Sequence, residues 1–586
     1  MTLFIRRKES EAGARKNHGC LWTIIVCTLL YIGLGVVFGL MFGSMFSDEQ
    51  AEIKKNTVYR LQMKGVLVEQ GRDTDPMAML MGEVYGRESQ DYVGLDDLLD
   101  NIRLAKEDDR VQGILLDGGE LQMGQASAKA LRDALLDFKE SGKWILAYAP
   151  SYGQTNYYVA SVADRICLNP TGTVNWNGLS AQKQYYTRAL EKIGVKVQIL
   201  KVGTFKSAVE PYFCTSMSDA DRKQTEQYLD GIWMVQRNAV SESRHLTHSR
   251  LDSLADRYMG LQDAQEYVAC GLIDTLIYRQ SVDTLLHELV GDKPHKLTTA
   301  QMATVERKKE SSKNHIAVVY AEGEITDNSG DGIVGTRMVR TLGKVLHDED
   351  VKAVVLRVNS PGGSADASEQ IWHAVQLLRE KGLPVVVSMG DYAASGGYYI
   401  SCGSDYIFAQ PNTLTGSIGI FGMVPNVSAI ADRVGIDIDG VSTHRYSSLE
   451  SDLIFRGDNA EQLALMQRMV ERGYDLFTGR CAEGRHMPQD SIKRIGEGRV
   501  WLGADALDLG LVDQLGNMDD AVSKAADLAG LGDDYRIVTF PEQKDFITQL
   551  LESLNNSSEE ERLLMRLRTL CSKPRIMARM EDVTIQ

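Results

Sequence analysis

The chain is 586 residues long, with 43% hydrophobic and 25% charged residues and a formal net charge of -16. This length exceeds what one hydrophobic core usually supports, so we expect two globular units with accessory segments. The hydrophobic and charged fractions are those of a folded protein and argue against long disorder. The acidic balance argues against nucleic acid as a partner, because binding phosphates requires a concentrated basic surface.

The N-terminal region has the pattern of a membrane anchor. Residues 20–46 contain no charged residue and are rich in Leu, Ile, Val and Phe, a stretch long enough for a helix to span a bilayer with some tilt. Residues 1–19 are net basic, so the positive-inside rule predicts a cytoplasmic N-terminus and export of everything after Ser47. A cleaved signal peptide is the alternative, but its apolar core would be far shorter.

The rest of the chain divides into two long halves. We expect a first repeat over residues 50–295, a polar linker over 296–314, a second repeat over 315–540 and a helical tail over 541–586. In both halves short β-branched runs alternate with helical stretches. Such alternation predicts parallel sheets with helical crossovers, and therefore an α/β fold.

The first half holds about 18 residues that the second half lacks, near residues 73–90, and they include the Met-rich run 77–81. They form either a loop packed on the body of the protein or an apolar flap near the membrane that guides hydrophobic substrate. The second half has the clearest pattern. It predicts strands at 315–320, 353–358 and 384–388, and helices at 341–347, 367–379 and 395–402.

A shift of about 240 residues aligns the two halves with each other. Residues 111–116 fall on residues 351–356, and Tyr158 falls on Tyr398. We interpret this match as a tandem duplication, which agrees with the two units expected from the length.

The two copies differ at two positions that could carry chemistry. Ser395 of the second copy aligns with Thr155, and Lys206 of the first copy aligns with Ser447. A candidate nucleophile is therefore kept in one half and a candidate base in the other. This pattern predicts one active site per chain, located between the halves.

Cysteines and histidines give no sign of a metal site or a cofactor. The eight cysteines are scattered without CxxC or other metal-ligand spacing, and the ten histidines do not cluster. His287-Glu288 begins like a zinc helix motif, but no second histidine follows at the required spacing. Export would permit disulfides, which the sequence alone cannot pair.

The segment around Ser395 suits an acyl-transfer nucleophile. An apolar strand enters a tight turn at 390–394, and Ser395-Gly396-Gly397 opens a helix whose free N–H groups can stabilise an oxyanion. The alternative is that Ser395 only caps this helix, since serine is a preferred N-cap residue.

A second glycine-rich turn could complete an oxyanion hole. In the run Asn-Ser-Pro-Gly-Gly-Ser at 359–364, the backbone amides of Gly362 and Gly363 can approach a ligand closely and act together with the N–H of Gly396. The alternative is an ordinary strand-to-helix turn. The equivalent segment 117–120 of the first copy carries acids that would repel an oxyanion, which predicts that this locus is inactive.

A histidine is the commonest base for such a serine, but no histidine lies between Ser395 and His444, and the sequence does not fix the orientation of His373 within its helix. A neutral lysine could act as the base instead. Lys206 stands in a mostly uncharged stretch, 203–209. A lysine base must be neutral, so its pKa must fall from about 10.4 by roughly three units, at a cost of about 4 kcal/mol to the charged form. The alternative is a lysine that extends into solvent.

Four separated motifs, at 206–211, 357–364, 393–398 and 413–422, resemble those of the signal peptide peptidase A family in its long, membrane-anchored bacterial form. The resemblance covers roughly residues 56–540. It implies the Clp protease and crotonase fold of repeated strand-strand-helix units, assembled as a homotetramer on the bacterial inner membrane with the catalytic domains in the periplasm. It also implies a serine endopeptidase that degrades cleaved signal peptides and other hydrophobic peptides.

Carried over by motif, the resemblance makes Ser395 the nucleophile, Lys206 the general base and Ser417 the residue that orients the lysine amine. The oxyanion donors would be the amides of Gly396 and of either Gly362 or Gly363.

Asp391 and Tyr392 depart from the glycine and apolar residue expected before the nucleophile turn, which suggests an altered substrate pocket. Two other functions are considered. A crotonase-like acyl-transfer enzyme would share the fold, but export denies it coenzyme A. A non-catalytic membrane scaffold would explain an inert first copy, but not the complementary serine and lysine.

Overall fold

The computed structural model describes residues 50–71, 91–307, 311–330, 332–457, 459–540 and 575–580. The described residues fall into two units, a small one of residues 50–52 with 304–306 and a much larger one that holds all the others. The segment predicted as an anchor, the insertion 73–90 and the expected tail helix lie outside the described residues. Within the described ranges, no helix is both long and apolar enough to cross a membrane.

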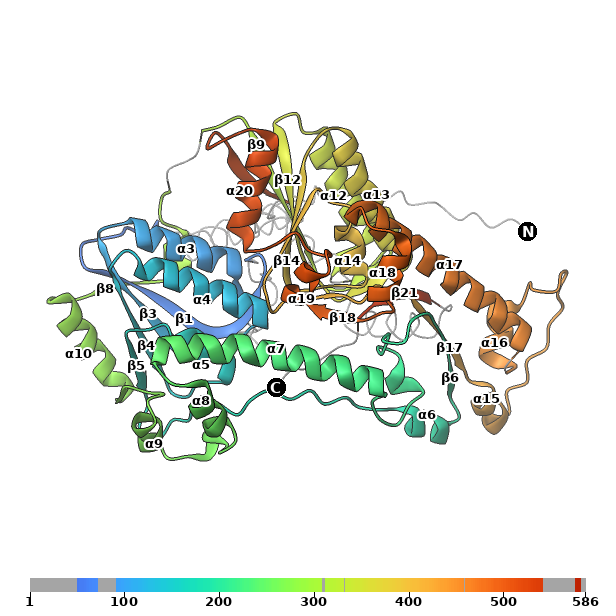
Figure 1. Ribbon diagram of the computed structural model, residues 1–586, viewed down its shortest axis with the longest axis horizontal. Coiled ribbons are helices and arrows are strands. Elements are labelled where there is room, and N and C mark those ends of the chain that lie inside the picture. Colours follow the sequence, from blue (N-terminus) through green and yellow to red (C-terminus); the bar gives the residue numbers. More distant parts are fainter. Residues whose placement is uncertain are drawn as a thin grey trace, which may run out of the picture. The chain divides into compact units, whose positions relative to one another are not determined.

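The first repeat is built on a parallel sheet in the order β2-β1-β3-β4-β5-β7, with β8 also paired to β1. Helices pack against it in the alternating pattern that the sequence predicts (Figure 1). The strands are β1 (Thr57–Val68), β2 (Tyr92–Gly94), β3 (Val111–Gln122), β4 (Trp144–Ala149), β5 (Arg165–Leu168), β7 (Thr275–Leu276) and β8 (His295–Thr298), and the helices include α3 (Leu95–Glu107), α4 (Gln125–Lys139), α5 (Gln154–Ala160) and α10 (Arg279–Val290).

The second repeat is built on a sheet in the order β18-β16-β14-β12-β9-β20, with β15 paired to β14 and to β19; only the β16–β18 pair is antiparallel. The predicted strands and helices are confirmed with two differences in extent. The helix expected at 341–347 begins at Gly335, and the strand expected at 384–388 continues to Ala394. The tight turn expected at 390–394 is therefore wrong, because residues 392–394 stay in the strand and pair with β16. The elements are β9 (His315–Glu322), α12 (Gly335–His347), β12 (Val351–Ser360), α13 (Ala365–Glu380), β14 (Val385–Ala394), α14 (Gly396–Ser401), β15 (Tyr406–Ala409), β16 (Leu414–Gly416), β18 (Val500–Leu502), β19 (Gln514–Leu515), α20 (Met518–Ala529) and β20 (Arg536–Phe540).

The core lies on both faces of this second sheet. Along β9, Ala317 and Val319 belong to one buried apolar cluster, while Ile316 and Val318 belong to another. Successive side chains of a strand point to opposite faces, so a strand covered on both sides is apolar throughout. This burial on both faces explains the β-branched runs in the sequence.

A third sheet joins the two repeats. Its order is β11-β10-β13-β21-β17-β6, and β17 is antiparallel to both β6 and β21. β6 (Lys196–Lys201) comes from the first repeat, whereas β10 (Ile325–Thr326), β11 (Ile333–Val334), β13 (Gly362–Ser364) and β17 (Phe421–Asn426) come from the second. β21 (Arg575–Arg579) comes from the tail, where the sequence predicted only helix.

Two long helices repeat the duplication. α7 (Asp219–Arg244) and α17 (Ala460–Arg485) each contain 26 residues and each end at a histidine in the left-handed conformation. Both begin with a side chain that accepts a hydrogen bond from the first turn, Ser218 for α7 and Asn459 for α17.

Short helices fill the remaining connections. They are α6 (Thr187–Ile193), α8 (His248–Ala255), α9 (Ala264–Ala269), α11 (Thr299–Ala303), α15 (Ser428–Val434), α16 (Leu449–Phe455), α18 (Gln489–Ile495) and α19 (Gly503–Asp508), with single 3-10 turns at Glu210–Tyr212 and Met259–Leu261. The segment expected as a linker from residue 296 is therefore regular over its first part, where the end of β8 and α11 pack against β1 and α3.

Candidate active site

Ser395 lies at the junction of β14 and α14, and its side chain is fully buried. Its backbone has φ 56° and ψ -112°, a strained conformation for a residue other than glycine, and its N–H donates to the Gly416 carbonyl at 2.8 Å. The side chain makes no capping hydrogen bond to the helix. Helix capping, the ordinary explanation for a serine here, therefore does not account for this residue.

Lys206 and Ser395 meet across the two repeats, as the sequence predicts. The lysine Nζ lies 2.7 Å from Ser395 Oγ, and it is also 3.1 Å from both Oγ and the carbonyl oxygen of Ser417. Only 1% of the Lys206 surface is exposed. Burial disfavours an ammonium ion, and these neutral oxygen partners suit a neutral amine.

Two glycines that the sequence did not single out make room for the lysine. A Cβ on Gly498 would lie 2.6 Å from the Cβ of Lys206, and one on Gly419 would lie 3.3 Å from its Cδ. Ser417 is held with φ 48° by a hydrogen bond from its N–H to the Arg499 carbonyl, while its Oγ donates to the Gly498 carbonyl at 3.2 Å. The only sequence signal for Gly498 is its place in a Gly-Glu-Gly turn at 496–498.

The two glycine-rich turns also come together. A Cβ on Gly362, which has φ 97°, would lie 2.6 Å from the nitrogen of Gly396, so only glycine fits. The amide of Gly362 donates to Ser360 Oγ at 3.1 Å. Gly363 instead lies opposite Ala578 in the antiparallel pairing of β13 with β21.

An extended segment of the chain's own tail lies beside these glycines. β21 pairs on one side with Gly362–Ser364 of β13 and on the other with Phe421–Met423 of β17; we call these two strand edges the peptide track. Ala578 is fully buried, and its carbonyl oxygen is 3.0 Å from the position of a Cβ on Gly396. Past it, the Met580 N–H donates to the Pro361 carbonyl at 2.7 Å. The track thus holds a peptide in β conformation next to Ser395.

The two departures from the expected motif have separate roles. Tyr392 packs in an apolar cluster with Met580, Leu414 and Val500, beside the peptide track, and its effect on a substrate pocket stays a prediction. Asp391 does not line that pocket, because its carboxylate turns toward the start of α4 in the first repeat. For Asp391 the predicted pocket role is therefore wrong.

The reciprocal pair does not reproduce this arrangement. Thr155 is partly buried and its Oγ1 accepts a long hydrogen bond, 3.4 Å, from Gln125. Ser447 lies exposed in the loop before α16.

One group of potential metal ligands occurs within the described part of the chain, His315 with Asp348 and Asp350. Arg536 Nε donates to His315 Nε2 at 2.7 Å, which leaves the proton of a neutral imidazole on Nδ1. A protonated ring nitrogen cannot ligate a metal, so we assign no metal here.

Comparison with known proteins identifies the family. The sequence profile of peptidase family S49 matches residues 137–292 and again residues 377–532. The chain belongs to peptidase family S49. The two matches are offset by the same 240 residues as the internal alignment, one in each repeat.

Full-length relatives agree with this assignment. Protease 4 of Haemophilus influenzae is 34% identical over 565 residues, which cover 92% of this chain and 91% of that protein. Protease 4 of Salmonella typhi is 33% identical over 546 residues, covering 90% and 86%. The chloroplastic serine protease SPPA of Arabidopsis thaliana is 27% identical over 512 residues, covering 84% and 72%. The resemblance to signal peptide peptidase A is confirmed, and the chain is a serine peptidase.

Proposed function

We propose that the chain is a serine endopeptidase that uses Ser395 as nucleophile and Lys206 as general base. The observation that carries this proposal is the 2.7 Å contact between the two side chains in a fully buried site. As Ser395 Oγ bonds to the carbonyl carbon of the substrate, its proton passes to the lone pair of the lysine Nζ. The resulting ammonium then gives a proton to the amine that leaves as the C–N bond breaks. Ser417 keeps Nζ directed at the nucleophile throughout.

The tetrahedral oxyanion would be held by two backbone amides, those of Gly396 and Gly363. Gly363 is preferred over Gly362, since the amide of Gly362 is already bonded to Ser360. Fixed N–H groups aimed at a developing charge in a water-excluded site stabilise the transition state strongly. Water then attacks the acyl-enzyme, with Lys206 again taking the proton and Ser395 leaving as the hydroxyl.

The substrates would be extended hydrophobic peptides, including signal peptides after their release from secreted proteins. The peptide track supports this proposal, because a strand pairs with it through main-chain hydrogen bonds on both sides. The residue beside the two glycine turns is an alanine with no exposed surface, which favours a small side chain on the acyl side of the cleaved bond.

The membrane anchor, the periplasmic location at the bacterial inner membrane and the homotetramer belong to the same proposal. Support for the anchor is the uncharged segment 20–46. Support for self-association is a set of exposed apolar side chains at the ends of α6 and α15 and in the loop after α15, and Arg433 of α15 donates to the Lys192 carbonyl of α6. The set comprises Ile193, Val434, Ile436 and Val441. Serine at the last three positions is expected to reduce the assembly seen by analytical ultracentrifugation.

Labelling with a serine-reactive fluorescent acylating probe tests the dyad. We expect the parent protein to be labelled, and Ser395→Ala and Lys206→Ala each to lose both labelling and hydrolysis of a quenched signal-peptide substrate. Lys223→Ala, which changes an exposed lysine of α7, serves as the control and should behave as the parent does. Retained hydrolysis in Ser395→Ala or Lys206→Ala would refute the dyad. No labelling of the parent would favour the scaffold, and turnover of acyl-coenzyme A without peptide hydrolysis would favour the acyl-transfer enzyme.

A further inference from the structure

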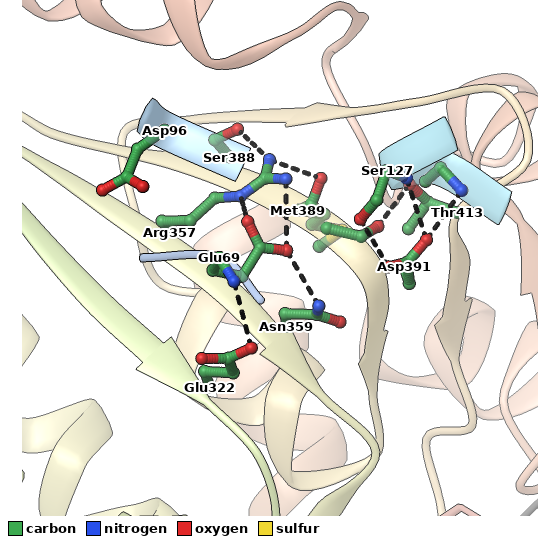
Figure 2. Close-up of polar contacts among 12 residues, drawn as sticks. Glu69, Asp96, Ser127, Glu322, Arg357, Asn359, Ser388, Met389, Asp391 and Thr413 are labelled. Atoms are coloured by element: carbon green, nitrogen blue, oxygen red, sulfur yellow. Dashed lines mark hydrogen bonds and ion pairs between the residues drawn. The ribbon is translucent and has the colours of Figure 1, made fainter. Parts of the chain in front are cut away.

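The proposed site takes its nucleophile from one repeat and its base from the other, so the reaction depends on how the repeats are held together. The strand that carries the nucleophile contacts the first repeat directly. Asp391, four residues before Ser395 on β14, accepts hydrogen bonds through Oδ1 from the N–H groups of Ala126 and Ser127, at 2.7 and 2.9 Å. Its Oδ2 accepts from Ser127 Oγ at 2.6 Å (Figure 2).

This contact caps a helix with a residue from the other repeat. The N-cap of α4 is Gly124, which has no side chain to offer the free N–H groups of the first turn. A Cβ at Gly124 would lie 2.1 Å from the carboxyl carbon of Asp391, so only a glycine leaves room for the Asp391 carboxylate here. A carboxylate at a helix N-terminus is further stabilised by the helix dipole.

From α4 the contacts continue to the long helix α7. Gln236 Nε2 of α7 donates to the Gln125 side-chain oxygen at 2.6 Å, and Arg132 donates to the carbonyl of Ala239 at 2.9 Å. Gln236 and Arg132 are both buried, so water competes little for these bonds. α7 is therefore fixed to α4 along its C-terminal half.

The other end of α7 holds the segment that carries the base. Gln224 donates to Ser207 Oγ at 2.8 Å and to the Phe205 carbonyl at 3.2 Å, the two neighbours of Lys206 in sequence. Its side-chain oxygen accepts from the N–H of Val500 in the second repeat, at 3.2 Å. Gln224 and Gln236 are twelve residues apart, about 18 Å along a rigid helix.

An ion pair across the repeats lies beside Asp391. Glu69 of the first repeat is 2.8 Å from Arg357 Nε on β12, and Asn359 donates to the same carboxylate at 2.8 Å. Arg357 also donates to Ser388 Oγ and to the Met389 carbonyl on β14 (Figure 2). A buried ion pair adds little net stability, but it strongly penalises a misaligned interface that leaves one charge unpaired.

We propose that Asp391 is a positioning residue of the reaction. Together with α4 and α7 it closes a circuit of contacts that runs from the nucleophile strand through the first repeat to the lysine segment. The circuit fixes the separation of Ser395 and Lys206. This inference rests on the proposed Ser/Lys dyad, and it assigns Asp391 no contact with substrate.

Asparagine at position 391 should preserve this role. Burial raises the pKa of the Asp391 carboxyl, the nearby Glu69 charge raises it further, and the hydrogen bonds from Ser127 oppose both. A neutral amide of the same shape avoids the desolvation of a charge. Its oxygen still accepts from the α4 N–H groups, and its NH2 can donate to Ser127 Oγ.

The test compares Asp391→Ala, Asp391→Asn and a control, Asp405→Ala, by kcat and KM on a quenched peptide and by Tm. Asp405 also accepts a backbone N–H bond on β14, that of Val385, but at the opposite end of the strand from Ser395. Misplacing reacting groups by about 1 Å can cost a hundredfold in rate. We expect kcat of Asp391→Ala to fall tenfold to a hundredfold with KM changed less than twofold. Asp391→Asn should stay within threefold of the parent, and Asp405→Ala should lose Tm without losing kcat.

Gln236→Leu breaks the circuit at the contact between α7 and α4, and it tests the positioning role if Asp391→Ala does not fold. We expect it to lower kcat selectively as well. An unchanged kcat in the folded variants would overturn the proposal, as would an equal loss of kcat in Asp405→Ala. Ser395→Ala in the same assay distinguishes a failure of the proposed dyad from a failure of the positioning role of Asp391. Activity retained in Ser395→Ala would refute the dyad itself.

Discussion

Replacing Ser417 with alanine tests how the lysine amine is aimed. The substitution removes an oxygen that lies 3.1 Å from Lys206 Nζ and donates to the Gly498 carbonyl at 3.2 Å, while Cβ and the φ of 48° are kept. Nζ keeps its hydrogen bonds to Ser395 Oγ and to the carbonyl of Ser417, so the amine is held less firmly but stays beside the nucleophile. A hydrogen bond of this kind is worth about 1–2 kcal/mol net. Since each 1.36 kcal/mol is tenfold in rate, we expect kcat to fall about fivefold to thirtyfold.

The assay is steady-state hydrolysis of a quenched peptide, with Tm measured on the same samples. KM should change little, because Ser417 is not part of the peptide track. Ser404→Ala is the matched control: Ser404 is also buried and also donates to a backbone carbonyl, that of Ser401 at 2.8 Å. It should lose a similar amount of Tm and keep kcat. A Ser417→Ala protein with the parent's kcat would refute the aiming role, and a loss as complete as that of Lys206→Ala would show that the serine does more than aim.

Three further outcomes follow from the structure. Gly362→Ala would place a Cβ 2.6 Å from the Gly396 nitrogen and should lower kcat at least a hundredfold. The control Gly382→Ala also has a positive φ, 87°, but no atom within 4 Å of its Cβ, so it should lower only Tm. Equal effects of the two variants on kcat would contradict the oxyanion assignment. A chain ending before residue 575 leaves the peptide track empty and should show a severalfold lower KM at unchanged kcat, and an unchanged KM would mean that β21 does not compete with substrate. Burial, and then the charge of Asp97, raises the pKa of Asp96 to about 7, so the folded protein favours the protonated carboxyl and loses stability as pH rises from about 4 to 7. Asp96→Asn should therefore flatten the dependence of Tm on pH between about 4 and 7. An unchanged slope would refute the raised pKa.

The internal alignment of the two copies brings out Ser395 and Lys206 as complementary positions, but it does not assign their roles. Helix capping and an exposed lysine explain the same residues, so the roles of nucleophile and base come from the motif resemblance. A serine ahead of two glycines and a lysine in an uncharged stretch stand at complementary sites of the two copies. The alternation of β-branched runs with helical stretches likewise predicts both parallel sheets, since strands buried on two faces must be apolar throughout.

The third sheet has no comparable signal. β6 and β17 belong to different repeats, and β21 follows residues 541–574 at the end of the chain. Each of these strands is short, and pairing between remote segments leaves no periodic mark in either of them. The role of Asp391 is hidden from the sequence for a related reason, because its partners are the backbone N–H groups of a helix more than 260 residues away.

The first repeat has Thr155 at the position of the proposed nucleophile, and the turn around Thr155 makes structural contacts instead. Thr155 stands where a nucleophile would, and its Oγ1 accepts a bond from the same Gln125 side chain that accepts one from Gln236 of α7. Gln154, the residue before Thr155, donates to the Gln236 side-chain oxygen at 3.0 Å. The turn that carries the nucleophile in the second repeat thus helps, in the first, to fix α7, which holds the segment around Lys206. One proposed catalytic junction and one supporting junction therefore account for the asymmetry of the two copies.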